Sequence, residues 1–132
     1  MRLVDTLRSY AQGAGTVEAC LPADSIVAGP RGELDEVAFV ELIAQGYATV
    51  KGYEDLLLGK PIQQGLLVGV RKLHLTGTAV AGERLLIGIN TIGIFEGFSV
   101  VEGNVTANGN IIAAGTIKLW LVNDGATPGE RP

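Results

Sequence analysis

The chain has 132 residues, of which 47% are apolar, and its formal net charge is −4. This length suits one domain with a substantial core and is too short for two domains of ordinary size. The acidic balance argues against a nucleic-acid partner, because phosphate binding needs a clustered basic patch. No run approaches the roughly 18 uncharged apolar residues of a membrane helix, so the sequence predicts no membrane partner either.

The high apolar content is better explained by an apolar subunit interface or an apolar ligand tunnel than by a bilayer. The single cysteine, Cys20, cannot form an internal disulfide. Its apolar neighbours indicate a buried structural thiol in a reducing compartment. A charge at Asp5 comes too early for the apolar core of a signal peptide. We therefore expect a cytoplasmic protein.

The first third of the chain predicts a hairpin followed by a long helix. Two short segments, Val4–Ala11 and Thr16–Leu21, flank turn residues 12–15 and indicate paired strands. A loop over 24–33 then leads into an apolar helix that ends near Gly52. Acidic residues crowd the start of this helix, where the positive end of the helix dipole favours them.

From residue 64 onward the pattern changes from helical to extended. Four segments rich in Val, Ile, Leu and Thr predict strands, namely Leu66–Leu75, Glu83–Ile94, Phe95–Ala107 and Ile111–Val122. Asn108–Gly109 is a strong signal for a tight turn between the last two. Residues 123–132 lack large apolar side chains, so we expect one domain over 1–122 and a disordered tail.

This order of elements indicates an α+β domain. One helix cannot cover both faces of a sheet of six strands. The pattern therefore favours a strongly curved antiparallel sheet wrapped around one long central helix, with its other surfaces closed by a partner subunit. The order of the strands within the sheet does not follow from the pattern.

Glu41 is the leading candidate for a functional residue, because it is a carboxylate within an apolar helical run over 34–50. Such a helix is normally buried, and a buried carboxylate is costly unless it is paired or used in chemistry. Gln45 lies one turn later on the same helical face, together with the small residues Ala48 and Gly52. The functional interpretation is a carboxylate that faces a cavity and is oriented by an amide. The alternatives are a polar stripe on a partly exposed helix and a carboxylate bonded to a partner subunit.

The chain contains three short motifs, at Val40–Gln45, Gly65–Arg71 and Ala81–Leu85. Together they resemble the hotdog-fold enzymes of acyl thioesters, and among them the 3-hydroxyacyl-[acyl-carrier-protein] dehydratase-like family. Residues Val40–Gln45 look like the "E-x-x-A-Q" signature of that family's central helix. Residues Gly65–Arg71 resemble the "G-x-L-x-G-x-R" strand of small aryl-polyene-type relatives. Residues Ala81–Leu85 are similar to the "G-D-x-L" turn that follows. In this order and spacing the motifs are fairly specific for the fold, and the resemblance covers roughly residues 3–122.

The resemblance implies a hotdog fold and a homodimer, with higher oligomers as a further possibility. It also implies a 3-hydroxyacyl substrate carried on the phosphopantetheine of acyl carrier protein or CoA, in fatty-acid or polyketide-type synthesis. No cofactor beyond this carrier is implied, and no Cys/His cluster indicates a metal. The family's catalytic carboxylate corresponds to Glu41, and the amide one turn later corresponds to Gln45.

The family's other catalytic residue, a histidine in the loop before the helix, has no counterpart here. The one histidine is His74, which we interpret as a surface residue near a strand end. Dehydration needs a base for the C2 proton and an acid for the hydroxyl group, so Glu41 alone leaves one role unfilled. Two alternatives stay open. One is a thioesterase in which Glu41 activates water or attacks the carbonyl, and the other is a non-catalytic acyl-binding or scaffold subunit.

Two further groups are candidates for substrate binding. The backbone amides of Gly32, Glu33 and Leu34 open the helix and are suited to polarise a thioester carbonyl. Arg71, in the matched strand motif, is a candidate for binding the phosphopantetheine phosphate or the acidic surface of a carrier protein. The weaker candidates for the same contact are Lys72, Arg84 and Arg31. Ordinary surface charge is the alternative explanation for all four basic residues.

Overall fold

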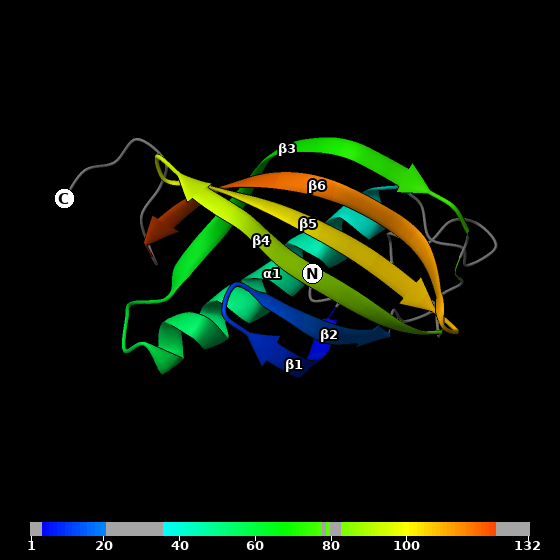
Figure 1. The fold of residues 1–132 in the computed structure, drawn as a ribbon, viewed down its shortest axis with the longest axis horizontal. Coiled ribbons are helices and arrows are strands. Elements are labelled where there is room, and N and C mark those ends of the chain that lie inside the picture. The colour runs from blue at the N-terminus through cyan, green and yellow to red at the C-terminus, as the bar shows by residue number, and fades with distance from the viewer. Residues whose placement is uncertain (1–3, 21–35, 78, 80–82, 124–132) are drawn as a thin grey trace.

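The computed structural model describes residues 4–20, 36–77, 79 and 83–123. These residues form two strands, one long helix and four further strands, in the order predicted from the sequence (Figure 1). Their bounds are β1 (Val4–Ala11), β2 (Ala14–Cys20), α1 (Glu36–Leu57), β3 (Gln63–Leu75), β4 (Arg84–Phe95), β5 (Phe98–Ala107) and β6 (Asn110–Asn123).

The strands form a single antiparallel sheet in the order β1-β2-β4-β5-β6-β3. The sheet curves around α1, which lies along its concave side (Figure 1). We call the side that packs on α1 the inner face and the opposite side the outer face. β1 and β3 are the two edge strands. This architecture confirms the predicted α+β class, with a curved antiparallel sheet around one central helix.

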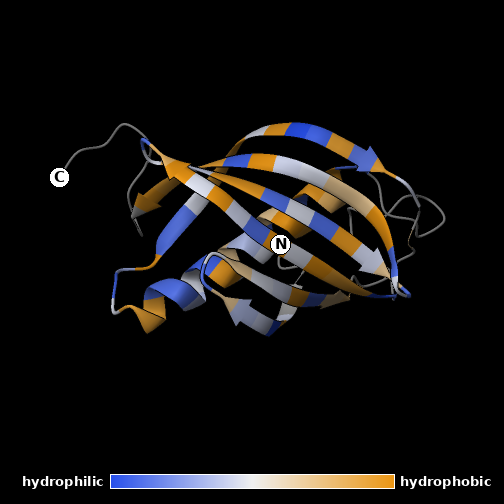
Figure 2. Cartoon of the chain, in the orientation of Figure 1, coloured by the Kyte–Doolittle hydropathy of each residue, from blue (hydrophilic) through white to orange (hydrophobic). Residues whose placement is uncertain are grey.

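The core lies between α1 and the inner face. Along β5, Val101, Val105 and Ala107 are buried, whereas the residues between Val101 and Ala107 on the other face are half-buried or exposed. Figure 2 shows this alternation as apolar and polar bands along the central strands. The helix contributes buried side chains from one side only, namely Phe39, Leu42, Ile43, Tyr47 and Val50. Full burial of a side chain of this size contributes ~1.5–3 kcal/mol.

Glycines allow α1 to approach the sheet closely. A Cβ atom on Gly103 of β5 would overlap the side chain of Ile43. On the helix, a Cβ atom on Gly46 would lie 2.9 Å from Cγ2 of Ile87 in β4. Protein interiors are close-packed, so neither position has room for a larger residue without movement of the helix. The two glycines therefore set the distance between the helix and the central strands.

Two hairpin turns have a left-handed backbone at both central residues. Asn108 and Gly109 have φ values of 51° and 80°, in agreement with the tight turn predicted there. Glu96 and Gly97, with φ values of 53° and 87°, form a second such turn that was not predicted. The prediction of a strand starting at Phe95 was wrong, because this residue is the last one of β4.

Two predictions for the first half of the chain were also wrong. Cys20 is exposed rather than buried. It follows the buried Ala19 in a strand whose successive side chains point to opposite faces. The helix continues to Leu57 instead of ending near Gly52.

The loop predicted over 24–33 and nearly all of the tail predicted over 123–132 lie outside the described residues. In the part of the chain that is described, no helix is long and apolar enough to cross a membrane.

Candidate functional site

Glu41 and Gln45 form a hydrogen-bonded pair on α1. The Nε2 atom of Gln45 donates to Oε1 of Glu41 at 2.9 Å. The pair forms because side chains four residues apart are neighbours on a helix surface. Within the described ranges, Gln45 is the one hydrogen-bond partner of the Glu41 side chain. The amide therefore orients the carboxylate and leaves its Oε2 atom without a partner from this part of the chain.

The pair lies on the side of α1 that faces away from the sheet. The neighbouring Leu42 and Ile43 contribute to the core and are fully buried, whereas Glu41 and Gln45 are half-buried. Glu41 is therefore not the fully buried carboxylate that an apolar helix suggested, because the sheet covers only one side of the helix. This geometry agrees with the alternative of a polar stripe on a partly exposed helix.

Small residues continue the same side of the helix beyond Gln45. Ala48 is exposed, and apart from the adjoining residues and the backbone of the helix, no described atom lies within 4 Å of the position that a Cβ atom on Gly52 would take. This side of α1 thus leaves room for a ligand or for the backbone of another subunit.

Several predicted features of the site lie outside the described residues. These are the backbone amides of Gly32, Glu33 and Leu34 and the side chain of Arg31. The role of those amides in polarising a thioester carbonyl therefore stays a prediction. Within the described ranges, no group of three or more His, Cys, Asp or Glu residues could hold a metal ion.

The basic side chains that are candidates for binding a phosphate or a carrier protein lie in two different places. Arg71 and Lys72 are exposed on β3 and line a hollow on the outer face. Arg84 lies at the start of β4, where its Nε atom is 3.6 Å from Oε2 of Glu18. Arg71 and Glu41 therefore lie on opposite sides of the sheet. The predicted contact between Arg71 and the substrate stays a prediction.

His74 also lies on the outer face and is exposed, as predicted for a surface residue. It is in register with Ala114, which is in register with Asn104. Directly opposed residues in a sheet point to the same face, and Asn104 alternates with the inward-facing Val105 along β5. The sheet therefore stands between His74 and Glu41 of the same chain.

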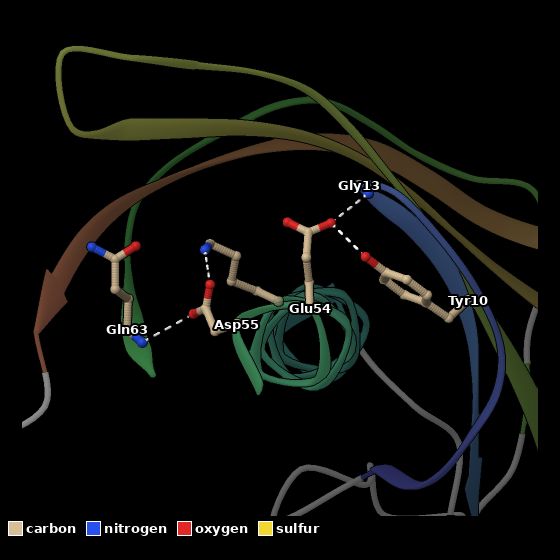
Figure 3. Close-up of polar contacts among 6 residues, drawn as sticks. Tyr10, Gly13, Glu54, Asp55 and Gln63 are labelled. Carbon is tan, nitrogen blue, oxygen red and sulfur yellow. Dashed lines mark hydrogen bonds and ion pairs between the residues drawn. The ribbon is translucent and has the colours of Figure 1, made fainter. Parts of the chain in front are cut away.

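Glu54, near the C-terminal end of α1, holds the β1–β2 hairpin (Figure 3). Its Oε1 atom accepts hydrogen bonds from the hydroxyl of Tyr10 and from the backbone N–H of Gly13, both at 2.8 Å. Partial burial of the phenol, together with the hydrogen bond to Glu54 and its negative charge, raises the pKa of Tyr10 to about 12. The sequence analysis did not single out this carboxylate.

Asp55, the next residue, holds the start of β3 on the other side of the helix end (Figure 3). Its side chain is 1% exposed and forms an ion pair with Lys51. Its second oxygen accepts a hydrogen bond from the backbone N–H of Gln63 at 3.2 Å. Acidic residues near a helix C-terminus oppose the helix dipole. Two acidic residues in the last turns of a helix therefore indicate that their side chains have partners elsewhere in the fold.

Comparison with protein families gives one match that covers most of the chain. The model of the ApeP-like family, described as ApeP dehydratase, matches residues 1–127. The comparison with curated proteins gave no match.

Solved structures share the fold at low sequence identity. The chain is similar to the dehydratase heterocomplex ApeI:P from Xenorhabdus doucetiae, with a TM-score of 0.82 and 18% identity over 92% of this chain and 84% of that one. It is also similar to smu.793 from Streptococcus mutans UA159 bound to acetyl CoA, with a TM-score of 0.69 and 15% identity over 92% and 90% of the two chains. A hypothetical thioesterase with coenzyme A from Streptococcus pneumoniae TIGR4 gives a TM-score of 0.65 and 12% identity over 89% and 88%. These similarities confirm the predicted hotdog fold.

Proposed function

We propose a function from the premise that the chain belongs to the ApeP-like dehydratase family. The protein is a dehydratase-like hotdog subunit that acts on 3-hydroxyacyl thioesters, with Glu41 and Gln45 at the centre of its site. The observation that carries this proposal is the hydrogen-bonded pair of these two residues on the open side of the central helix. The family match and the "E-x-x-A-Q" motif support it.

In this proposal Glu41 handles the hydroxyl group of the substrate. Dehydration takes a proton from C2 and the hydroxyl group from C3, so one group accepts a proton while another protonates the leaving oxygen. The protonated carboxyl group of Glu41 donates to that oxygen, which leaves as water and gives the enoyl thioester. Gln45 keeps the carboxyl group in position through its hydrogen bond of 2.9 Å.

The base for the C2 proton needs another source than His74. This histidine lies on the outer face of the sheet, whereas Glu41 lies on the helix beyond the inner face. A second copy that continues the same sheet through an edge strand keeps its own His74 on the outer face as well. A homodimer therefore offers two copies of Glu41 but no histidine near them. We therefore propose that a group other than histidine takes the C2 proton.

The edge strand β3 is the proposed contact between subunits. It is 13 residues long and, as an edge, has one side without a neighbouring strand within the described sheet. Leu67 and Val68 on this strand are 42% and 53% exposed. Long apolar edge strands are prone to pair with another strand, and proteins usually protect them. Edge-to-edge pairing of β3 would continue the sheet across the homodimer that the resemblance implies, or across a heterodimer.

The acyl group in this proposal arrives on the phosphopantetheine of acyl carrier protein or of CoA, in fatty-acid or polyketide-type synthesis in the cytoplasm. No cofactor other than this carrier is needed for the reaction. Support comes from two similar structures, one bound to acetyl CoA and the other containing coenzyme A.

The proposal is tested with the purified chain, 3-hydroxybutyryl-CoA and crotonyl-CoA, by following the interconversion of the two thioesters. Glu41→Gln keeps the shape of the side chain but removes the acid, so we expect at least a ~100-fold loss of rate, as for other general acids. Glu36→Gln, which changes an exposed carboxylate on the same helix, is the matched control. Interconversion that is equally fast in Glu41→Gln would contradict the role of this residue.

Release of free CoA is measured in the same samples, because thioester hydrolysis is the alternative that needs only one carboxylate. In that mechanism Glu41 activates water or attacks the carbonyl carbon directly. CoA release that depends on Glu41, without interconversion, would replace the dehydratase proposal with a thioesterase.

A second candidate function is that of a complementing subunit without activity of its own. The specific observation in its favour is the placement of His74 away from Glu41, and the similar ApeI:P structure is a dehydratase heterocomplex. The test is whether the isolated chain binds 3-hydroxybutyryl-CoA without turning it over.

Native mass spectrometry of Val68→Lys, with Ile111→Lys as an exposed control on β6, tests whether the β3 edge holds the dimer.

A further inference from the structure

A hollow of about 600 Å³ lies on the outer face, on the side of the sheet away from Glu41. Its apolar part includes Ile92 and Phe95, which are 52% and 57% exposed, together with the half-buried Phe98. Its basic part consists of Arg71 and Lys72 from β3 and Lys118 from β6. Apolar side chains with a few convergent charged groups are the usual composition of a small-molecule site.

A distortion of β3 brings two of these cations into the same hollow. Consecutive residues of a regular strand point to opposite faces, yet Arg71 and Lys72 both line the hollow. The register of β3 against β6 shifts between Arg71 and His74, and Lys72 has a φ of 54°. A left-handed backbone is unfavourable for lysine, and such strained residues cluster at functional sites. The bulge thus keeps a strained residue in a place where it adds a third cation to the hollow.

Among the described residues, no opposite charge lies at ion-pair distance from the three cations. The ion pairs of the described residues join Arg8 and Arg84 to Glu18 and Lys51 to Asp55, and none includes Arg71, Lys72 or Lys118. Two carboxylates, Glu96 and Glu102, also line the hollow. Neither of them forms an ion pair with these cations among the described residues, and the amide of Asn90 is 3.5 Å from Glu102. Like charges held close together favour the binding of an anion between them.

An aromatic pair lies beside the cations, and one of its members, Phe98, lines the hollow. The Nζ atom of Lys118 lies 4.3 Å from the centre of the Phe98 ring. Phe98 meets Trp120 edge to face, with 4.6 Å between the ring centres. Trp120 is the only tryptophan of the chain. Its fluorescence is therefore a probe of the hollow through its contact with Phe98.

We propose that this hollow is a binding site for a small amphiphile with an anionic oxygen head group. The carboxylate or phosphate of the ligand lies between Arg71, Lys72 and Lys118, and its aliphatic body lies on Phe95 and Phe98. The site is separate from the Glu41–Gln45 pair. It does not depend on the proposed dehydratase activity.

The test is a titration of the full chain with octanoate, octyl phosphate and the uncharged octanamide, followed by Trp120 fluorescence. We expect saturable binding of at least one of the two anions, at least tenfold tighter than octanamide, and weaker binding as salt is added. The difference in affinity between octanoate and octyl phosphate shows whether the site prefers a carboxylate or a phosphate head group. Equal affinity for octanamide and both anions, or no saturable signal, would overturn the proposal.

Lys72→Gly is the most informative variant. Glycine accepts a positive φ, so this change removes the charge while relieving the strain. We expect about tenfold weaker anion binding together with a melting temperature that rises by a few degrees. Lys118→Met weakens binding in the same way, whereas Lys60→Gly, at an exposed lysine outside the hollow, leaves it unchanged. Unchanged anion affinity in both Lys72→Gly and Lys118→Met would overturn the proposal.

Glu41→Gln separates this site from the proposed active site. We expect this variant to bind octanoate with the same change in Trp120 fluorescence as the parent chain. A loss of that signal would show that the anion binds beside Glu41 instead, and the outer-face site would then be rejected. Failure of the thioester assays, in contrast, leaves this binding experiment unaffected.

Discussion

The two ends of α1 carry carboxylates in opposite situations. Near the C-terminal end, Glu54 and Asp55 bind a phenol and two backbone N–H groups from other parts of the fold, and Asp55 also pairs with Lys51 of the same helix. In the N-terminal half, Glu41 is half-buried and has only Gln45, from the same helix, as its partner within the described residues. A carboxylate with fixed partners in distant segments contributes to stability. One that is held by a single neighbouring amide keeps an oxygen for a ligand.

A carboxylate can oppose the helix dipole and still have a structural role. Glu54 and Asp55 lie near the negative end of the helix dipole, and the last turn of α1 has no basic residue. Each such placement costs about 0.3–1 kcal/mol at an exposed site. Their contacts offset this cost because they attach both edge regions of the sheet, the β1–β2 turn and the start of β3, to one helix end.

The largest loss in the free energy of unfolding is expected for Asp55→Ala. This change leaves the ammonium group of Lys51, whose side chain is 12% exposed, without its counter-ion, and it removes the acceptor for the N–H of Gln63. Breaking a buried ion pair by removing one partner costs about 3–5 kcal/mol. Urea denaturation measures the loss. A loss below about 1 kcal/mol would instead be typical of a solvated surface pair and would contradict the structural role of this residue.

Glu54→Ala is expected to have a smaller effect. It leaves the N–H of Gly13 and the hydroxyl of Tyr10 without their acceptor, at about 1–3 kcal/mol for groups that are shielded from water. Glu54→Gln keeps one acceptor oxygen and serves as the milder control. Hydrogen exchange shows which part of the fold is destabilised. The amide of Gly13 should exchange faster in Glu54→Ala, while the β5–β6 amides keep their protection.

The strands and the long helix were predictable because their signals are local. Period-two alternation marks the strands, and Asn108–Gly109 marks a turn by residue type alone. The Glu96–Gly97 turn was missed because glutamate rarely adopts a positive φ and the flanking residues are all apolar. The order of the strands was not predictable, since it depends on contacts between distant segments.

The candidate site was predictable in its residues but not in its surroundings. A helical spacing of four is enough to place Glu41 beside Gln45. The exposure of Glu41 depends on which side of the helix the sheet covers, and an almost uniformly apolar helix does not reveal that side. The contacts of Glu54 and Asp55 were missed for a related reason. Their partners, among them Tyr10 and Gln63, come from distant strands or from the next element along the chain.

Alkaline titration of Tyr10 tests the C-terminal contacts without unfolding the protein. Its pKa is raised from an ordinary value of 10.0 to about 12, so the folded state favours the protonated phenol. The stability that this group contributes is complete below pH 10 and is lost as the pH rises toward 12. NMR of labelled tyrosine measures the midpoint. In Glu54→Gln we expect the pKa of Tyr10 to fall, while partial burial keeps it above 10.

The smallest effect on stability is expected for Glu41→Gln. This variant tests most directly whether Glu41 differs from Glu54 and Asp55 in having no structural role. The side chain is half-buried, and a glutamine at this position still offers an oxygen to the Nε2 atom of Gln45. The free energy of unfolding should therefore change by no more than about 0.5 kcal/mol, as for other substitutions away from buried networks. The same urea experiments measure it beside Asp55→Ala. A loss of 2 kcal/mol or more, on the order of that expected for a broken buried contact, would mean that Glu41 is a structural residue like Glu54. A small loss, combined with lost turnover or lost thioester binding, is what a carboxylate kept for a ligand predicts.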